Sequence, residues 1–342
     1  MRCLSLSFRK HASLLGACAA PCALKFSQKP FCSETGGDNP EQGPGHKATL
    51  GLFSWGRGES GVLGHSSDRD ESLPRQVYAA PLEGKDLLLE CGLFHSAIVS
   101  DGDLWMWGKG SGGRLGQGDE EWAHEPQMVQ SVREISGEPL AQMSLGGLHS
   151  SGVTPSGQVF TWGHGGFGAL GHGAFKNSLL PQLVKGPWQG GGRIVATSCG
   201  GAHTLALSSE GEVYSWGRDE GEGRLGLCPD NEDLILHNAV PFPSRVFDLP
   251  PARQISAGGF HSLAVTDGDV PRVYSWGANE NGELGLGQDD EGGWQPISIE
   301  EFEGVPMTSV GAGGFHSVAL TQKGEVPSLP PCSVAGSCCA YF

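Results

Sequence analysis

The sequence predicts an all-β fold of the propeller class, and three observations lead to this prediction. Glycine supplies 56 of the 342 residues, and glycine destabilises helix interiors. Nine Trp and 14 Phe residues supply enough apolar surface for a folded core, because each large ring can bury about 150–250 Å². A Trp-Gly signature recurs five times at intervals of 52 to 60 residues, and such a period is typical of propellers and solenoids. No apolar run reaches the length of a transmembrane helix.

Each repeat carries three short signatures in a fixed order. An aromatic residue, one further residue and Trp-Gly come first, Leu-Gly follows about eight residues after the Trp, and a Gly-rich turn ending in His-Ser or His-Thr comes last. The five tryptophans are Trp55, Trp107, Trp162, Trp216 and Trp276. The five histidines are His95, His149, His203, His261 and His316. Five occurrences of three ordered signatures indicate five copies of one structural unit.

Each unit is predicted to form four short strands, as the second repeat illustrates. Its expected strands are Asp103–Trp107, Pro126–Val129, Leu140–Leu145 and His149–Val153. The glycine-rich run 108–118 between the first two is expected to be a loop. Residues two apart on a strand share a face, so the two aromatic residues of each Trp strand point the same way. One sheet cannot cover that face alone, whereas sheets stacked around an axis can, as in the blades of a propeller.

These motifs resemble those of the regulator-of-chromosome-condensation repeat family, and the resemblance covers about residues 50–322. The family propeller has seven blades, whereas only five complete repeats occur here. After the fifth histidine signature the sequence continues to Val326 as if into another Trp strand, and then departs from the pattern. We interpret this as a truncated or alternatively spliced product that lacks two blades and forms an open ring. A closed ring of five blades is the alternative.

The expected organisation has four segments. Residues 1–33 form an organellar transit peptide, residues 34–49 a Gly/Pro-rich linker, residues 50–323 the five-repeat propeller, and residues 324–342 a divergent, disordered tail with Pro and Cys. The first 33 residues contain five basic residues and no acid, which is typical of a transit peptide. A mitochondrial location is expected. The alternatives are the chloroplast, or the nucleus and cytoplasm if the leader is no transit peptide.

Several motifs that resemble binding sites have simpler structural explanations. Three Gly-x-Gly-x-x-Gly runs follow Trp strands, but Leu-Gly and a polar loop come next instead of the helix that a dinucleotide site requires. The five histidines are one to a repeat, so we expect each to form a hydrogen bond within its own blade instead of binding a metal. Cys91 and Cys199 occupy a position that Leu or Ala fills in other repeats, which predicts small buried side chains. No cofactor or metal is expected.

Charged residues define the candidate binding surface. Acidic residues cluster in the loop after Leu-Gly in four of the five repeats, and a basic residue or His follows Trp-Gly in four. Because equivalent loops of a propeller share one end, these residues are expected on one rim. The candidate residues are Arg57, Asp70, Glu71, Lys109, Asp119, Glu120, Glu121, His164, Arg218, Asp230, Asp233, Asp289 and Asp290. The rim is either a docking face for a partner with a basic surface or a solvated surface that maintains solubility.

The net charge is −16, although the leader is basic, so the remainder is strongly acidic. An acidic surface is a poor match for phosphate backbones, and direct nucleic-acid binding is not expected. The resemblance implies a non-catalytic protein-interaction scaffold for organellar assembly or RNA processing. It also implies an alternative, a guanine-nucleotide exchange factor for a small Ras-like GTPase. A weaker alternative is an ultraviolet-B photoreceptor, whose Gly-Trp-Arg-His-Thr motif is approached only at Gly293-Trp294-Gln295-Pro296.

Overall fold

The structure is a computed structural model, and six segments of the chain are described. These segments are residues 51–78, 87–190, 192–219, 223–227, 238–287 and 292–322. The predicted transit peptide (1–33), linker (34–49) and divergent tail (324–342) lie outside the described residues.

The described residues form four four-stranded sheets and two two-stranded sheets, all antiparallel with consecutive strands adjacent. The two-stranded sheets are β1 (Leu52–Gly56) with β2 (Glu71–Val77), and β19 (Met307–Ala312) with β20 (Ser317–Thr321). The first four-stranded sheet contains β3 (Leu87–Cys91), β4 (His95–Ser100), β5 (Asp103–Gly108) and β6 (Ala123–Val129). The second contains β7 (Gln142–Leu145), β8 (His149–Val153), β9 (Val159–Gly163) and β10 (Ser178–Leu183). The third contains β11 (Ile194–Cys199), β12 (His203–Ser208), β13 (Val213–Arg218) and β14 (Ala239–Arg245). The fourth contains β15 (Ala252–Ala257), β16 (His261–Thr266), β17 (Val273–Ala278) and β18 (Gly292–Ser298).

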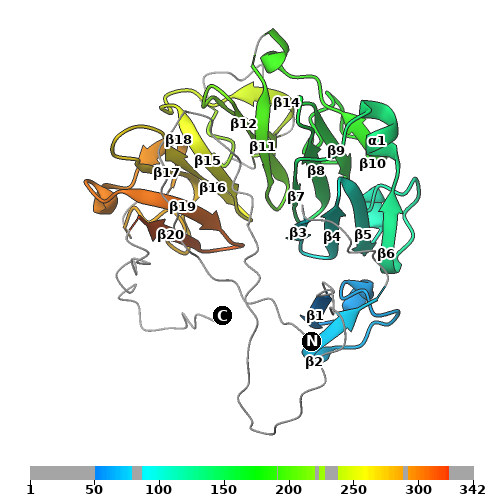
Figure 1. The fold of residues 1–342 in the computed structure, drawn as a ribbon. Coiled ribbons are helices and arrows are strands. Elements are labelled where there is room, and N and C mark those ends of the chain that lie inside the picture. Colours follow the sequence, from blue (N-terminus) through cyan, green and yellow to red (C-terminus); the bar gives the residue numbers. More distant parts are fainter. Residues whose placement is uncertain are drawn as a thin grey trace, which may run out of the picture.

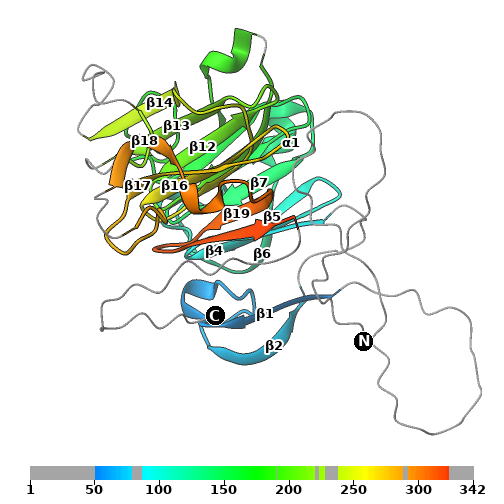
Figure 2. The ribbon, with the colours of Figure 1, turned by 90° about the vertical axis from the view of Figure 1, so that its left-hand side faces the viewer.

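The sheets are arranged side by side as blades around a common axis, and the ring is not closed (Figure 1). The view turned by 90° shows the first half-sheet, β1 and β2, beneath the remaining blades (Figure 2). The predicted all-β propeller of four-stranded blades is therefore confirmed, and its ring is open. The two half-sheets stand at the two ends of the arc.

The blades are shifted in phase relative to the sequence repeats. In every complete blade the histidine strand pairs with the Trp strand that follows it in the sequence, so that His95 lies opposite Gly108 and His203 opposite Gly217. A blade therefore joins the end of one repeat to the start of the next. This phase explains why five sequence repeats give four complete blades and one half-sheet at each end.

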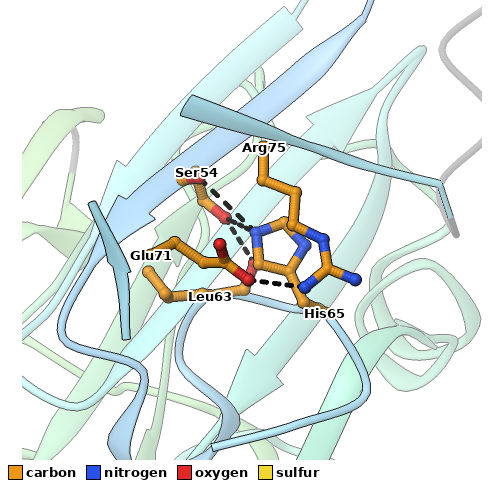
Figure 3. Close-up of polar contacts among 5 residues, drawn as sticks. All are labelled: Ser54, Leu63, His65, Glu71 and Arg75. Carbon is orange, nitrogen blue, oxygen red and sulfur yellow. Dashed lines mark hydrogen bonds and ion pairs between the residues drawn. The ribbon is translucent and has the colours of Figure 1, made fainter. Parts of the chain in front are cut away.

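In four of the five repeats the hydroxyl of the residue before Trp-Gly ties the Trp strand to the loop that follows it, whereas Met106 takes this place in the second repeat. Ser54 Oγ donates to the carbonyl of Leu63 at 2.5 Å and lies 2.9 Å from Nε2 of His65 (Figure 3). Thr161 Oγ1 donates in the same way to the carbonyl of Leu170, at 2.6 Å. In these four repeats one hydrogen bond therefore joins the Trp strand to the Leu of Leu-Gly, nine or ten residues further along the chain.

The Trp and Leu-Gly signatures of neighbouring blades also pack together and form part of the core between blades. The indole of each following blade packs against the Gly of Leu-Gly in the preceding one: a Cβ on Gly116 would lie 3.0 Å from Nε1 of Trp162. Trp107, Trp162, Trp216 and Trp276 are buried, as the repeat pattern predicted. Trp55, in the first half-sheet, is 59% exposed.

The histidines join neighbouring blades, which corrects the expectation that each bonds within its own blade. His149 Nε2 lies 2.7 Å from Oγ1 of Thr204, and the other three such contacts follow the same pattern. A second inter-blade link runs through the backbone, where Gly147 N–H donates to the carbonyl of Gly200 at 3.0 Å. His95, His149, His203 and His261 are fully buried, whereas His316 in the last half-sheet is exposed. The difference arises because no described blade follows His316.

Two further details depart from the sequence-based expectations. Cys199 is buried as predicted, but Cys91 is exposed, since the inner strand β3 has no complete blade on its preceding side. A short helix, α1 (Ser131–Ser136), was not predicted, and it ends at Gly137 with φ of 71°. One-turn 3₁₀ helices occur at Glu59–Gly61, Ser111–Gly113, Pro187–Gly190 and Glu300–Phe302. None of the helices in the described segments has the length and apolar character needed to cross a bilayer.

Candidate interaction surface

The residues that follow Trp-Gly emerge at equivalent places in successive blades. The backbone N–H of Lys109 donates to the carbonyl of Phe94 at 2.9 Å, and that of His164 donates to Leu148 at 3.1 Å. Arg218 forms the same bond with Ala202 at 3.0 Å. Each of these bonds joins the start of the loop to the residue just before the buried histidine. The structure therefore brings the predicted basic positions to one end of the blades, beside the histidine turns.

Aromatic rings hold these basic side chains in place. Lys109 Nζ lies 5.1 Å from the ring centre of Phe94 and 6.0 Å from that of Trp122. The guanidinium of Arg218 lies 4.4 Å from the ring centre of Phe167, which is itself 5.3 Å from the ring of His164. Cations within about 6 Å of an aromatic face are attracted by its quadrupole. The surface thus alternates basic and aromatic groups instead of carrying isolated charges.

Two buried arginines lie beneath this surface and were not among the predicted residues. Arg114 is 4% exposed and donates from Nη1 to the carbonyl of Gly147 at 2.9 Å, in the next blade. Arg224 is 1% exposed, with its guanidinium 4.8 Å from the ring centre of Phe260. Both precede Leu-Gly, a position held by Val62 and Ala169 in other repeats. Glu283 takes the same position in the fifth repeat, so a charged residue there in three of the five repeats was the available signal.

The acidic loop of the second repeat is exposed. Asp119, Glu120 and Glu121 are all exposed, and the Asp119 carboxylate accepts the backbone N–H of Glu121 at 3.1 Å. This loop packs against the segment that follows Trp-Gly. A Cβ on Gly110 would lie only 1.7 Å from the carbonyl oxygen of Glu121. The backbone of Glu121 therefore lies against that of Gly110, the residue after Lys109. The second glycine of this Gly-x-Gly run therefore allows the two backbone segments to approach closely.

The acidic residues of the first repeat mainly support their own loop. Asp70 Oδ1 accepts the N–H of Gly58 at 2.9 Å, and Glu71 forms an ion pair with Arg75 at 2.5 Å (Figure 3). Arg57 is exposed and pairs with Glu59 at 2.6 Å. The remaining candidates, Asp230, Asp233, Asp289 and Asp290, lie outside the described residues.

The buried histidines are neutral members of the scaffold. Burial, with a further contribution from the Arg114 charge, lowers the pKa of His95 and of His149 to about 3. Burial lowers the pKa of His261 to about 4. Burial also raises the pKa of Cys199 to about 12, so its thiol stays protonated at neutral pH. Within the described segments no three His, Cys, Asp or Glu side chains gather in a group that could hold a metal ion.

Family comparison places residues 51–329 within the RCC1-like domain. The chain is 43% identical over 303 residues to the Arabidopsis thaliana protein named RCC1 domain-containing protein RUG3, mitochondrial, covering 82% of this chain and 65% of that protein. It is 31% identical over 278 residues to the ultraviolet-B receptor UVR8 of Arabidopsis thaliana, covering 80% and 59%. It is 32% identical over 280 residues to the secretion-regulating guanine nucleotide exchange factor of Mus musculus, covering 80% and 58%. The chain thus spans less than two thirds of the length of these three relatives.

Solved structures share the fold. The crystal structure of Prp20p from Saccharomyces cerevisiae superposes with a TM-score of 0.67 at 24% identity, covering 79% of this chain and 64% of that one. The crystal structure of human WBSCR16 gives a TM-score of 0.64 at 23% identity, covering 79% and 67%. At this level of identity the likeness shows the fold alone.

Proposed function

Because this chain belongs to the RCC1-like domain family, we propose that it is a non-catalytic protein-interaction scaffold that supports assembly or RNA processing in the mitochondrion. The observation that carries the proposal is the loop end of the blades, where charged side chains are held over aromatic rings and remain accessible. Lys109 and Arg218 are both only half-buried there. Rigid charged and aromatic groups on loops of a stable scaffold are characteristic of protein-binding surfaces.

The partner in this proposal carries a basic surface that meets the exposed acidic loop of the second repeat. Charge complementarity mainly raises the rate at which partners associate and makes that rate dependent on salt. Glu120 and Glu121 are the best positions to test, because both are exposed while Asp119 caps the loop. The proposed surface also includes four acidic residues at equivalent positions of other repeats, Asp230, Asp233, Asp289 and Asp290.

The mitochondrial part of the proposal rests on two observations. The leader 1–33 has five basic residues and no acidic residue, and the Arabidopsis relative with 43% identity is named as mitochondrial. The full chain fused to a fluorescent protein should locate to mitochondria, and removal of residues 1–33 should abolish this location. Import that persists without these residues would contradict the transit-peptide assignment.

Co-purification from cells tests the scaffold function. Recovery of mitochondrial ribosomal or RNA-processing proteins is expected with the full chain. The variant Glu120→Lys with Glu121→Lys should slow capture of the partner severalfold and weaken the salt dependence of capture. The matched control reverses two exposed glutamates elsewhere, Glu300 and Glu301, and should capture the partner normally. Equal capture by both variants at every salt concentration would refute the acidic docking surface.

The second candidate function is guanine-nucleotide exchange on a small GTPase. It is favoured by the 32% identity to a mouse protein named as an exchange factor, and by the fold shared with Prp20p, whose structure was described together with its binding to Gsp1p. An exchange factor binds its GTPase most tightly when the GTPase carries no nucleotide. Recovery of a GTPase that GDP or GTP abolishes, together with accelerated release of labelled GDP, would favour exchange over the scaffold.

A further inference from the structure

The last half-sheet contains a hollow at the place where every complete blade receives a tryptophan. In the complete blades, each indole packs on the Gly of the preceding Leu-Gly, as Trp107 does on Gly64 and Trp216 on Gly171. The equivalent glycine for the last half-sheet is Gly285. A hollow is lined there by Leu284, Gly285, Ser317, Val318 and Ala319, among other residues. No described Trp strand follows β20, so no indole of the described residues occupies this position.

Two of the four buried indoles donate to a backbone carbonyl whose equivalent is present at the last half-sheet. The carbonyl of Val62 accepts both Ser96 Oγ at 3.0 Å and Trp107 Nε1 at 2.8 Å. The carbonyl of Ala169 accepts Thr204 Oγ1 at 2.9 Å and Trp216 Nε1 at 2.8 Å in the same way. At the last half-sheet the corresponding carbonyl, that of Glu283, accepts Ser317 Oγ at 2.7 Å. The first of the two bonds therefore exists there, and the second requires a tryptophan.

The other end of the arc presents the missing group. Trp55 is 59% exposed, although its four equivalents are buried. Its strand, β1, pairs with β2 and with no other strand of the described residues. The strand is nevertheless well formed, because the Ser54 hydroxyl forms hydrogen bonds with the Leu63 carbonyl and His65 Nε2 of the same half-sheet (Figure 3). Within the described segments, β1 is thus a folded Trp strand without a histidine strand, and β20 follows a histidine but has no Trp strand beside it.

The residue types of the two strands match in the register that the blades use. In all four complete blades the histidine lies opposite the Gly of Trp-Gly and a hydroxyl residue lies opposite Trp. In three of them a small residue lies opposite the first aromatic residue, whereas Ile98 lies opposite Trp105 in the first. Examples of a small residue opposite the first aromatic residue are Ala206 with Tyr214 and Ala264 with Tyr274. Applied to β20 and β1, the same register places Ala319 opposite Phe53 and Ser317 opposite Trp55. Every pair then has the composition that folded blades already contain.

From these observations we propose that the hollow beside Gly285 binds Trp55 of a second copy of this chain, with β1 of that copy adding to the edge of β20. The two half-sheets then form one complete four-stranded blade. Addition of a strand to a free edge satisfies backbone N–H and C=O groups, and the side chains provide specificity. The contact is heterologous, since two different surfaces meet, so each added copy offers a new Trp55 and a new hollow.

Pairing within one chain is disfavoured by the repeated contacts between blades. The four inter-blade histidine contacts span 2.7 to 3.0 Å, and the backbone links from Gly147, Gly201 and Gly259 are each 3.0 Å. These contacts join successive blades in the same way, and β1 and β20 lie on opposite sides of the opening (Figure 1). Closure would require every interface to repack, and close-packed interiors resist such changes.

Mass measurement of the full chain over a range of concentrations tests the proposal. We expect species larger than one copy that dissociate on dilution. Trp55→Ala and Val318→Glu should each weaken association at least tenfold, because a buried Trp anchor and an apolar strand edge are lost. Val318 is 53% exposed, so its change should leave the fold intact. Leu73→Glu, at a position 74% exposed on β2, is the matched control and should associate normally. A single-copy mass at all concentrations would overturn the proposal.

Disulfide formation tests the register and distinguishes one copy from two. The double variant Phe53→Cys with Ala319→Cys is prepared in normal and heavy isotopes and mixed before oxidation. Mass spectrometry should find the 53–319 link in mixed-isotope pairs, at least tenfold above the link in the control variant Ser54→Cys with Ala319→Cys. Side chains of neighbouring residues on a strand point to opposite faces, so the control cannot link in this register. Links found only within single chains would show closure of one ring and overturn the proposal.

Discussion

The Nε2 atom of His149 lies 2.7 Å from Oγ1 of Thr204, and this contact crosses from one blade to the next. Thr204 Oγ1 also donates to the carbonyl of Ala169 at 2.9 Å, so its single proton is already used. His149 must therefore carry its proton on Nε2 and donate it to the hydroxyl oxygen. Its Nδ1 is buried without a hydrogen-bond partner in the described structure. One repeated pair of residues thus fixes the tautomer of a histidine and the attachment of two blades.

Removal of the hydroxyl at this contact should loosen the interface between the blades. Thr204→Val deletes both hydrogen bonds with little change in shape and leaves the His149 donor unsatisfied. We expect the free energy of unfolding to fall by about 1–3 kcal/mol. Chemical denaturation measures the loss, and Thr308→Val at an exposed site should change stability by less than about 0.5 kcal/mol. Equal stability of the two variants would mean that the contact contributes nothing.

The buried histidines should make the protein sensitive to mild acid. The folded pKa is about 3 for His95 and His149 and about 4 for His261, because burial opposes the charged form. The unfolded chain protonates near its ordinary value of 6.5, so it binds more protons than the folded state as pH falls below 6.5. Stability must therefore decrease, by up to about 2 kcal/mol per histidine between pH 6.5 and pH 5. Burial raises the pKa of Glu90 to about 7, which acts in the opposite direction and offsets part of the loss.

Denaturation at pH 6.5 and at pH 5 tests the histidine contribution directly. His149→Gln removes one titrating group, so the acid-induced loss should shrink by about 1–2 kcal/mol relative to the unmodified chain. His316→Ala alters a histidine that is exposed and should leave the loss unchanged. A loss that is identical in all three proteins would assign acid sensitivity to other groups.

The strands and their side-chain alternation were predictable from local sequence. The expected strand 149–153 coincides with β8, and the expected strand 103–107 is β5 without its final Gly. Alternating residues and turn-forming glycines fix such elements within a few residues of sequence. The pairing of the buried histidines with the next blade was not predictable in this way, because it depends on contacts about 55 residues apart.

The candidate surface was predictable in part. Repeat equivalence assigned Lys109, His164 and Arg218 to corresponding positions, and each of them forms the same backbone bond. The aromatic partners were missed. Phe94 meets Lys109 only because the histidine strand and the Trp strand pair with His95 opposite Gly108. That phase is a property of the folded blade, and the order of motifs along the sequence does not reveal it.

Gly110 should be essential for the shape of the acidic loop. An added Cβ would lie 1.7 Å from the carbonyl oxygen of Glu121, which is backbone and cannot rotate away. Gly110→Ala should therefore displace the loop or reduce the free energy of unfolding by about 2 kcal/mol or more. Denaturation and partner capture at low salt measure the two effects. Gly314→Ala is the control, because no atom lies within 4 Å of its Cβ position; a similar result for both variants would contradict the proposed packing.

Arg114 should stabilise the junction between the first two complete blades and influence the histidines beside it. Its Nη1 donates to the Gly147 carbonyl at 2.9 Å and its Nε donates to the Ser111 carbonyl at 3.0 Å. Arg114→Met keeps the apolar stem but loses both bonds, so we expect a loss of about 1–3 kcal/mol at pH 7. The Arg114 charge also lowers the pKa of His95 and His149, so the variant should lose less additional stability than the unmodified chain as the pH falls from 5 toward 3. The control Arg133→Met removes an exposed guanidinium that pairs with Asp103 and should change stability by less than about 1 kcal/mol. If Arg114→Met retained the full acid-induced loss, the guanidinium would act through its hydrogen bonds alone. If Arg114→Met were as stable as Arg133→Met, the bond to Gly147 would not hold the blades together.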